Sequence, residues 1–461
     1  MSDAREATAQ SVRALAAWAA ATPPERLPAQ ILQRAARVLA DDLSAIVGAR
    51  DEPEVKAFHG KVLERAKHAE ATVFRGGRPR TDRLSAAVAN GLAGDWIELD
   101  EGYRQAPCHA GIYVVPALLA DAEARNLTLA ELLRALALGY EIVTRIARAW
   151  TPRELNQQSH GRYCAIGAAA AVSLSQRKSA VNLADAIGAA ATLVGPSPRN
   201  HVVQGVLIRN AWPAWGAWSG MMAVEWVDCG IAGTPAALHD TYTTILGGEA
   251  HPERLAAGLG EQWGILDGYT KIYACCQHLH SAVEAAIDLR PRLLGEAALG
   301  DIERIEVETH PLALPLMNAR PPTSLAAKFS MSHAMAAVLA TGSGGADAFA
   351  AATLTEPAIA RLRERVSVKP WQPELPPPHD RPARVTLALR DGRTLSGECL
   401  SARGGPDRPL PPQVVLDKMD ALAVPVYPEM RRVFDQLLPL EPRRMGQGWT
   451  DIVSEMCRPR G

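Results

Sequence analysis

The segment 96–111 is dense in groups that can transfer protons or bind an anion. Its polar and ionisable side chains include Glu98, Asp100, Glu101, Tyr103, Arg104 and His109. A carboxylate beside an imidazole orients the ring and raises its basicity, and proton abstraction next to a carboxylate needs such a base. Because loops between rigid elements commonly carry sites, this acid-rich loop is a candidate active site. The alternative is a solvated connection between two helices, with His109 capping the second one.

A second candidate region lies where helical patterns give way to mixed ones. Clefts favour such junctions, so Lys271 is predicted to bind a substrate carboxylate as a point charge, and His280 to bind substrate or transfer protons. The same stretch contains the adjacent pair Cys275-Cys276 and His278, which raises the question of a metal. Adjacent cysteines cannot easily share one tetrahedral ion, and free cysteine is common in protein cores. We therefore predict no metal site.

More basic side chains lie close to predicted helix starts. His160 opens an apolar helix whose N-terminus attracts anions, although a lone histidine there can equally be a structural cap. Lys328 precedes another helix start and either binds an anion or only fixes a turn. Arg199 and Arg209 belong to a further basic segment. Together these cations suggest an anionic substrate.

The elements that must position these side chains are mostly helices. Apolar residues recur three and four apart in a series of segments that extends to about residue 264. The predicted helices are 7–18, 27–47, 85–92, 127–150, 161–174, 182–194 and 213–227. Thr128 is predicted to cap the fourth of them, just before Glu131. Helix follows helix without strand patterns between them, which indicates a helical domain.

The pattern changes after residue 266, where strands are predicted for the first time. Residues 302–309 alternate apolar and charged side chains, as a half-buried strand does. Asp391-Gly392 supplies a tight turn between strands 384–389 and 394–399. The remaining elements are helices at 332–341 and 356–366, Pro-rich loops at 373–382 and 406–412, and a helical tail at 415–456. The order strand, two helices, two strands predicts a small α+β domain.

The composition narrows the class of protein. With 461 residues, 48% of them apolar and 21% charged, the chain is long enough for two domains and ordinary for a folded protein. A formal net charge of −1 and seven scattered cysteines indicate neither a nucleic-acid partner nor a disulfide framework, and fit a cytoplasmic protein. We recognise neither a secretory signal nor the roughly 18 apolar residues of a membrane helix. The signatures of nucleotide-binding loops, zincins and nucleophile elbows are also missing.

The ordered series of these segments resembles the MmgE/PrpD family, which includes 2-methylcitrate dehydratase, cis-aconitate decarboxylase and iminodisuccinate epimerase. The matching segments are 87–91 (AVANG), His109 with 115–119 (VPALL), 138–141 (LGYE), His160 with 167–171 (GAAAA), Lys271 with 275–280 (CCQHLH), 327–330 (AKFS) and 391–392 (DG). The resemblance implies a mostly α fold in which both chain ends, 1–267 and 412–461, build a large helical domain. A smaller α+β lid domain at 268–411 is inserted between them. The resemblance also implies a homodimer without a required metal or organic cofactor.

Members of the family act on di- or tricarboxylates, at a site lined by an acid-rich loop, two histidines and lysines from both domains. Carried over to this chain, the resemblance implies that His109, His160 and Lys271 are catalytic. The residues predicted to bind substrate beside them are Glu98, Asp100, Tyr103, Arg104, Gln204, His280 and Lys328. The chain departs from the family pattern at Gln204, which stands where a lysine is expected, and at Gly102, which stands where a threonine is found.

Losing a cation and a hydroxyl weakens the binding of a tricarboxylate, because each charge-assisted contact contributes about 1.5–3 kcal/mol. Neither cis-aconitate nor methylcitrate is therefore expected as the natural substrate. The predicted function is a lyase, either a dehydratase, a hydratase or a decarboxylase. In it, His109 or His160 takes a proton α to a carboxylate while Lys271 stabilises the developing enediolate. Epimerisation shares this step and stays open as an alternative, as does a non-catalytic homologue.

Overall fold

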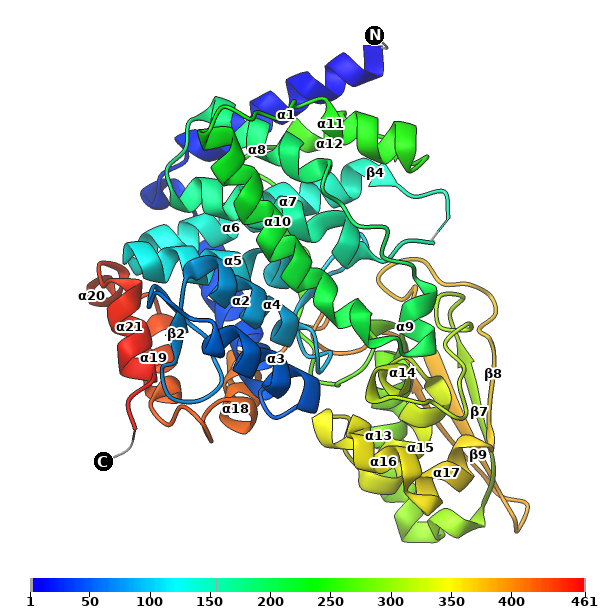
Figure 1. Ribbon diagram of the computed structural model, residues 1–461. Helices are drawn as coiled ribbons and strands as arrows, with labels where there is room; N and C mark the ends of the chain where they lie inside the picture. The colour runs from blue at the N-terminus through cyan, green and yellow to red at the C-terminus, as the bar shows by residue number, and fades with distance from the viewer. Residues whose placement is uncertain (1–2, 155, 460–461) are drawn as a thin grey trace.

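Alanine-rich segments with apolar residues three and four apart fold as helices and form the larger part of the molecule (Figure 1). The structure is a computed structural model that describes residues 3–154 and 156–459. The longer helices of this part are α1 (Asp3–Ala21), α2 (Ala29–Gly48), α3 (Pro53–Glu64), α4 (Arg83–Gly94), α5 (Ala110–Arg125), α6 (Leu129–Ala149), α7 (Ser159–Ser175), α8 (Ala180–Ala191) and α10 (Trp212–Asp228). The mostly α fold is confirmed. Helix α3 was not predicted, and five of its twelve residues are charged residues or histidine.

Helix α7 is the centre of the helical part. All its residues are buried, and it packs against α5, α6, α8 and α10. Small residues allow the close approach: a Cβ at Gly220 of α10 would lie 2.4 Å from the carbonyl oxygen of Ala165 in α7. Thr128 accepts a hydrogen bond from Glu131 N–H at 3.3 Å, so the predicted cap of α6 is confirmed. The alanine-rich composition therefore reflects helices whose backbones lie close together.

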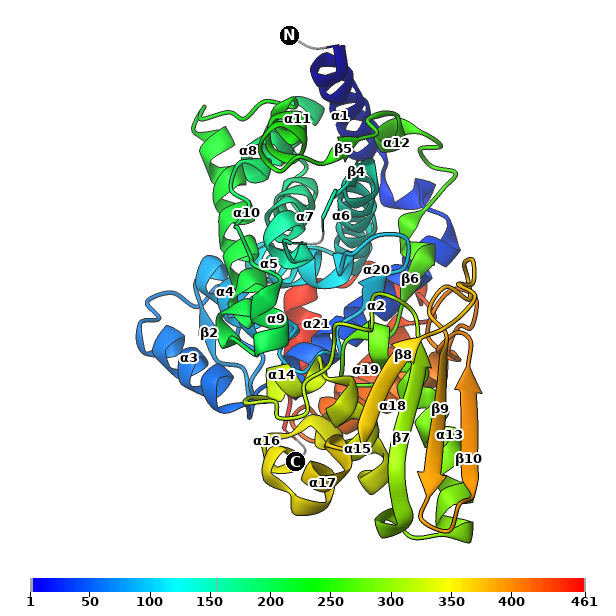
Figure 2. The same cartoon turned by 90° about the vertical axis from the view of Figure 1, so that its right-hand side faces the viewer.

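The second part of the molecule is built on a four-stranded sheet (Figure 2). Its strands are β7 (Ile302–Thr309), β8 (Val366–Pro370), β9 (Ala383–Leu389) and β10 (Thr394–Cys399), in the spatial order β10-β9-β7-β8. The accompanying helices are α13 (His280–Glu296), α14 (Ser324–Lys328), α15 (Met331–Thr341), α16 (Ala351–Thr355) and α17 (Pro357–Arg363). Helix α13 packs on β9 and β10, so one face of the sheet is covered. The predicted hairpin is present, with Gly392 at φ 88° in its turn.

The prediction was wrong between residues 356 and 370. Helix α17 ends at Arg363, and β8 follows as a parallel neighbour of β7 at the edge of the sheet. Strand β8 has five residues, all half-buried or exposed, and it ends at Pro370. So short an edge strand has no buried face that would mark it in the sequence. A parallel partner also depends on a distant strand, which local periodicity does not reveal.

The end of the chain returns to the helical part. The C-terminal helices are α18 (Pro412–Leu422), α19 (Met430–Leu437), α20 (Pro442–Met445) and α21 (Trp449–Met456). Helix α18 packs against α2, and α21 packs against α5. The predicted domain boundaries at 267/268 and 411/412 stay a prediction. None of the described helices is long and apolar enough to cross a membrane.

Candidate active site

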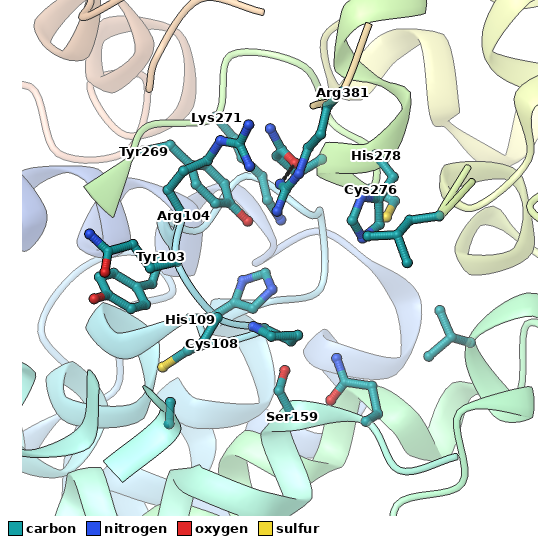
Figure 3. A pocket seen from close by; sticks show the side chains of 18 of the residues that line it. Tyr103, Arg104, Cys108, His109, Ser159, Tyr269, Lys271, Cys276, His278 and Arg381 are labelled. Carbon is teal, nitrogen blue, oxygen red and sulfur yellow. Dashed lines mark hydrogen bonds between the residues drawn. The ribbon is translucent and has the colours of Figure 1, made fainter. Parts of the chain in front are cut away.

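A cavity of about 780 Å³ opens between the helical part and the α+β part. Its lining comes from the acid-rich loop, the start of α7, residues 199–209, residues 267–278 and the loop 377–381. Figure 3 shows His109 and Ser159 on one side of the cavity, with His278 and Arg381 on another. Residues as far apart in the chain as Glu98 and Asp407 therefore line the same cavity.

Two short strands bring the two candidate regions of the sequence together. Strand β3 (Gly102–Tyr103) of the acid-rich loop pairs with β6 (Gly268–Tyr269), in the register Gly102 opposite Tyr269. A Cβ at Gly102 would lie 2.3 Å from the ring of Tyr269, so this close pairing requires glycine. Lys271, two residues beyond β6, consequently reaches the carboxylates of the loop.

His109 and Asp100 form a hydrogen-bonded pair at the cavity surface. The His109 Nδ1 lies 2.7 Å from Asp100 Oδ2, and the imidazole keeps 15% of its side chain exposed. No described residue contacts its Nε2 by a hydrogen bond, and His109 lines the cavity. When Nδ1 donates its proton to Asp100, the Nε2 lone pair is left free to accept a proton from a bound molecule.

Lys271 is fully buried and neutralises two carboxylates. Its Nζ donates to Glu98 Oε2 at 3.0 Å and to Asp100 Oδ1 at 3.3 Å. Burial by itself lowers the pKa of Lys271, but Asp100 and Glu98 outweigh it and raise this pKa well above its usual value. Burial likewise favours a protonated Asp100, yet Lys271 and His109 hold the pKa of Asp100 well below its ordinary range. Lys271 therefore stays a cation and Asp100 an anion.

Arg209 extends the ion network behind the acid-rich loop. Its guanidinium contacts Asp95 Oδ2, and its second Nη lies 2.6 Å from Glu98 Oε1. The arginine is almost fully buried and stacks over the ring of Phe329 at 5.3 Å. Burial raises the pKa of Glu98, but Arg209 and Lys271 together bring it below the usual value. Burial raises the pKa of Asp95 well above its usual value, although Arg209 opposes the shift. Two buried cations thus face three buried carboxyl groups, and removing either cation leaves charge uncompensated.

His160 lies behind His109 rather than at the cavity surface. Its Nε2 is 2.5 Å from Asp95 Oδ2, and its Nδ1 is 2.9 Å from the Tyr113 hydroxyl, so both ring nitrogens have protein partners. The two histidine rings meet edge to face, 4.9 Å apart between centroids. Burial and the nearby Arg209 hold the pKa of His160 well below its usual value. A neutral, fully bonded imidazole positions His109 more readily than it accepts a substrate proton.

The remaining predicted residues fall into two groups. Glu98, Tyr103 and Arg104 line the cavity, whereas Gln204, His280 and Lys328 do not. Gln204 is exposed at the end of α9 (Asn200–Gln204). His280 forms a hydrogen bond with the Cys275 carbonyl, and Lys328 donates one to the Trp96 carbonyl. Burial and the positive charge of nearby Lys271 lower the pKa of His280 to about 3. His280 is therefore neutral at physiological pH.

Several lining residues were not assigned to the substrate from the sequence. Arg209 completes the ion network with Asp95, which lies behind the cavity surface, and Tyr269 and Arg381 also line the cavity. His278 lines the cavity as well, although it was weighed only as a metal ligand. For Arg381, the signal available in the sequence was the charged pair Asp380-Arg381 inside a Pro-rich loop.

One group of side chains has the geometry of a metal site. Oxygen and nitrogen atoms of Asp95, Asp100 and His109 lie within 4.8 Å of one another. Arg209 and Lys271 already pair with these carboxylates, so a divalent cation would have to compete with two buried cations. The prediction that the protein binds no metal stays a prediction.

Glu101 is a buried carboxyl group of the acid-rich loop, and its protonation affects the stability of the fold. This fully buried side chain accepts hydrogen bonds from Gly111 N–H at 2.6 Å and from the Tyr140 hydroxyl at 3.0 Å, and so holds the start of α5. Burial raises the pKa of Glu101 from 4.5 to about 7, while Arg34 opposes the shift. The folded protein therefore keeps a proton on Glu101 at pH values where the unfolded chain has released it.

We expect the free energy of unfolding, relative to that of the Glu101→Gln variant, to fall as the pH rises from about 4.5 to 7. In this window the folded state binds more protons than the unfolded state, so raising the pH destabilises it. A shift from 4.5 to about 7 corresponds to on the order of 3 kcal/mol. Urea denaturation of both proteins at a series of pH values measures the difference. A difference independent of pH would contradict the assignment.

Comparisons with known proteins agree with the arrangement of the chain. Residues 13–246 match the family model of the MmgE/PrpD N-terminal domain, and residues 273–439 match that of the MmgE/PrpD C-terminal domain. A cis-aconitate decarboxylase-like protein from Aspergillus oryzae is 24% identical over 453 residues, 92% of this chain and 93% of that protein. A cis-aconitate decarboxylase from Aspergillus terreus is 26% identical over 352 residues, 70% of either chain.

Proposed function

This chain belongs to the MmgE/PrpD family, and from that premise we propose that it is a lyase acting on a small di- or tricarboxylate. The observation that carries the proposal is the cavity-facing His109, oriented by Asp100 beside the buried cation Lys271. Relatives named cis-aconitate decarboxylase support the substrate class. The site therefore combines a base with a cation that can stabilise negative charge on a carboxylate.

In the proposed reaction His109 Nε2 accepts the proton from the carbon next to a substrate carboxylate. The electron pair of the broken C–H bond moves into that carboxylate as an enediolate, and Lys271 stabilises the new negative charge. Asp100 keeps the imidazole in the tautomer with a proton on Nδ1 and stabilises the imidazolium that forms. His160 and Asp95 support the ring from behind.

Dehydration completes this step, whereas decarboxylation reaches a similar carbanion with His109 starting as the proton donor. In a dehydration the enediolate expels a β-hydroxyl group, which takes the proton back from the His109 imidazolium and leaves as water. In a decarboxylation the C–C bond to a carboxylate breaks first, CO₂ leaves, and the resulting carbanion takes a proton from protonated His109. Both run through the same carbanion-like state, so one arrangement of residues serves either.

Proton NMR in D₂O with a panel of di- and tricarboxylates tests the proposal. We expect the wild-type protein to eliminate water or release CO₂ from one of these carboxylates, with reaction at a carbon α to a carboxylate. Deuterium entering the substrate without loss of water or CO₂ would identify an epimerase or isomerase instead. Binding of carboxylates without any exchange or loss would contradict catalysis and favour a non-catalytic homologue.

We propose in addition that two copies of the chain associate through the outer face of α10, which crosses the front of the helical part in Figure 1. Trp215 is 46% exposed on this helix, and Trp212, Trp218 and Trp226 are half-buried. Ile208, 57% exposed, lies just before the helix. Exposed apolar side chains gathered on one face are typical of an interface between proteins.

We expect the Trp215→Glu variant to be monomeric, because a carboxylate buried at an apolar interface loses its hydration without gaining a partner. Light scattering coupled to size-exclusion chromatography measures the mass. Ile245→Glu, an equivalent change at a position 76% exposed outside α10, is the control. A Trp215→Glu variant with the wild-type mass of a dimer would exclude this face as the interface.

A further inference from the structure

One wall of the cavity carries more positive charge than its neighbours balance. Arg104, Arg199, Arg381 and His278 line this part of the cavity and are called the cationic wall here. Arg104 comes from the acid-rich loop, Arg199 from the segment before α9, and the other two from the α+β part. Figure 3 shows Arg104, Arg381 and His278 on the side of the cavity opposite Ser159.

Asp380 is the carboxylate that pairs with this wall, and Arg104 occupies it. The two Nη atoms of Arg104 lie 3.2 Å and 2.5 Å from the two oxygens of Asp380. The Nε of Arg381 is 3.9 Å from the same carboxylate, beyond hydrogen-bond distance. Arg381 therefore has only this longer ion pair, and neither Arg381 nor Arg199 forms a hydrogen bond with a carboxylate within the described residues.

Several donors of the cationic wall have no hydrogen-bond partner among the described residues. They are the Nε of Arg381 and the buried Nδ1 of His278, and the guanidinium of Arg199 likewise forms no hydrogen bond or ion pair there. Arg381 donates to the Gln277 side chain through one Nη only. Native proteins rarely leave such groups unpartnered, so donors on a cavity wall point to a ligand.

The groups of the cationic wall repel one another electrostatically. Burial and the neighbouring Arg104 lower the pKa of Arg381 to about 10. Burial, Arg381, His310, Arg199 and Arg104 hold the pKa of His278 well below its usual value, so its ring is neutral and offers a single N–H. An anion bound here would relieve the repulsion between the arginines.

We propose that the cationic wall binds a second carboxylate of the substrate, away from the carbon that His109 deprotonates, and that Arg381 determines the preference for dianions over monoanions. The inference rests on the proposed function and adds the residues that select the substrate. The planar guanidinium fork matches a carboxylate through two parallel hydrogen bonds, which a lysine does not provide. Lys271 and His109 then act at one end of the substrate, and Arg381, Arg199 and His278 hold the other.

Calorimetric titration with two probes of equal size tests the proposal without requiring turnover. Succinate carries two carboxylates, and succinamate replaces one of them with an amide. We expect the wild-type protein to bind succinate more tightly, and Arg381→Gln to reduce that preference by on the order of tenfold, as the loss of one charge-assisted contact does. Arg381→Lys should recover only part of the preference. Arg320→Gln, which removes an 85% exposed arginine of the same α+β part, should leave it unchanged.

The possible outcomes separate this proposal from the proposed function. A preference that is unchanged in both Arg381→Gln and Arg199→Gln, or equal weakening of both probes, would overturn the assignment. Inorganic phosphate binding with the same dependence on Arg381, without any preference for succinate, would also overturn it. A preference lost in Arg381→Gln supports it, even if no carboxylate of the panel exchanges in D₂O and the proposed reaction fails.

Discussion

Replacing His109 with asparagine is expected to slow α-proton exchange of the active carboxylate by about 10²–10⁴-fold, the usual contribution of a positioned general base. Asparagine keeps a donor that can bond Asp100, so the buried acid is not left without a partner. It removes the Nε2 lone pair that faces the cavity. The rate of deuterium incorporation in D₂O, followed by proton NMR, measures the change.

Two further variants make this result specific. His68→Asn removes an exposed histidine outside the site, and its exchange rate should equal that of the wild type. Substituting His160 is expected to act through the orientation of His109, because both of its ring nitrogens already have protein partners. Wild-type exchange in His109→Asn would overturn the assignment of His109 and return His160 to consideration as the base.

Replacing Arg209 with methionine is expected to lower the free energy of unfolding by about 3–5 kcal/mol, the cost of removing one partner of a buried ion pair. Methionine fills most of the space but leaves Asp95 without its cation and Glu98 with Lys271 alone. These carboxylates are almost fully buried and gain no water in compensation. Urea denaturation, monitored by circular dichroism, measures the loss.

The matched comparison is Arg13→Met, which breaks an exposed ion pair with Glu6 at 3.4 Å and should not change stability measurably. The double variant Arg209→Met with Glu98→Gln should be more stable than Arg209→Met alone, because one uncompensated charge is gone. If Arg209→Met unfolds at the wild-type urea concentration, the network does not contribute to stability in the way its burial indicates.

A large part of the fold follows from local patterns. Helix α6 with its Thr128 cap, the buried helix α7 and the hairpin around Gly392 were all predicted, because three- and four-residue periodicity and turn residues act within a few positions. Strand β8 was missed, since its half-exposed residues pair with β7 only in the folded chain. Helix α3 was missed as well, and only Val55 and His59 of its twelve residues are buried.

The site shows the same division. The sequence by itself determined the family, the mostly α fold and the acid-rich loop with His109, because these depend on residue types and their order along the chain. Only the tertiary structure decided which groups meet. Lys271 reaches Glu98 across 173 positions, Arg209 reaches Asp95 across 114, and Arg104 reaches Asp380 across 276. Such pairings depend on strand register and helix packing, and the burial that excludes water decides which ring faces the cavity and which is enclosed.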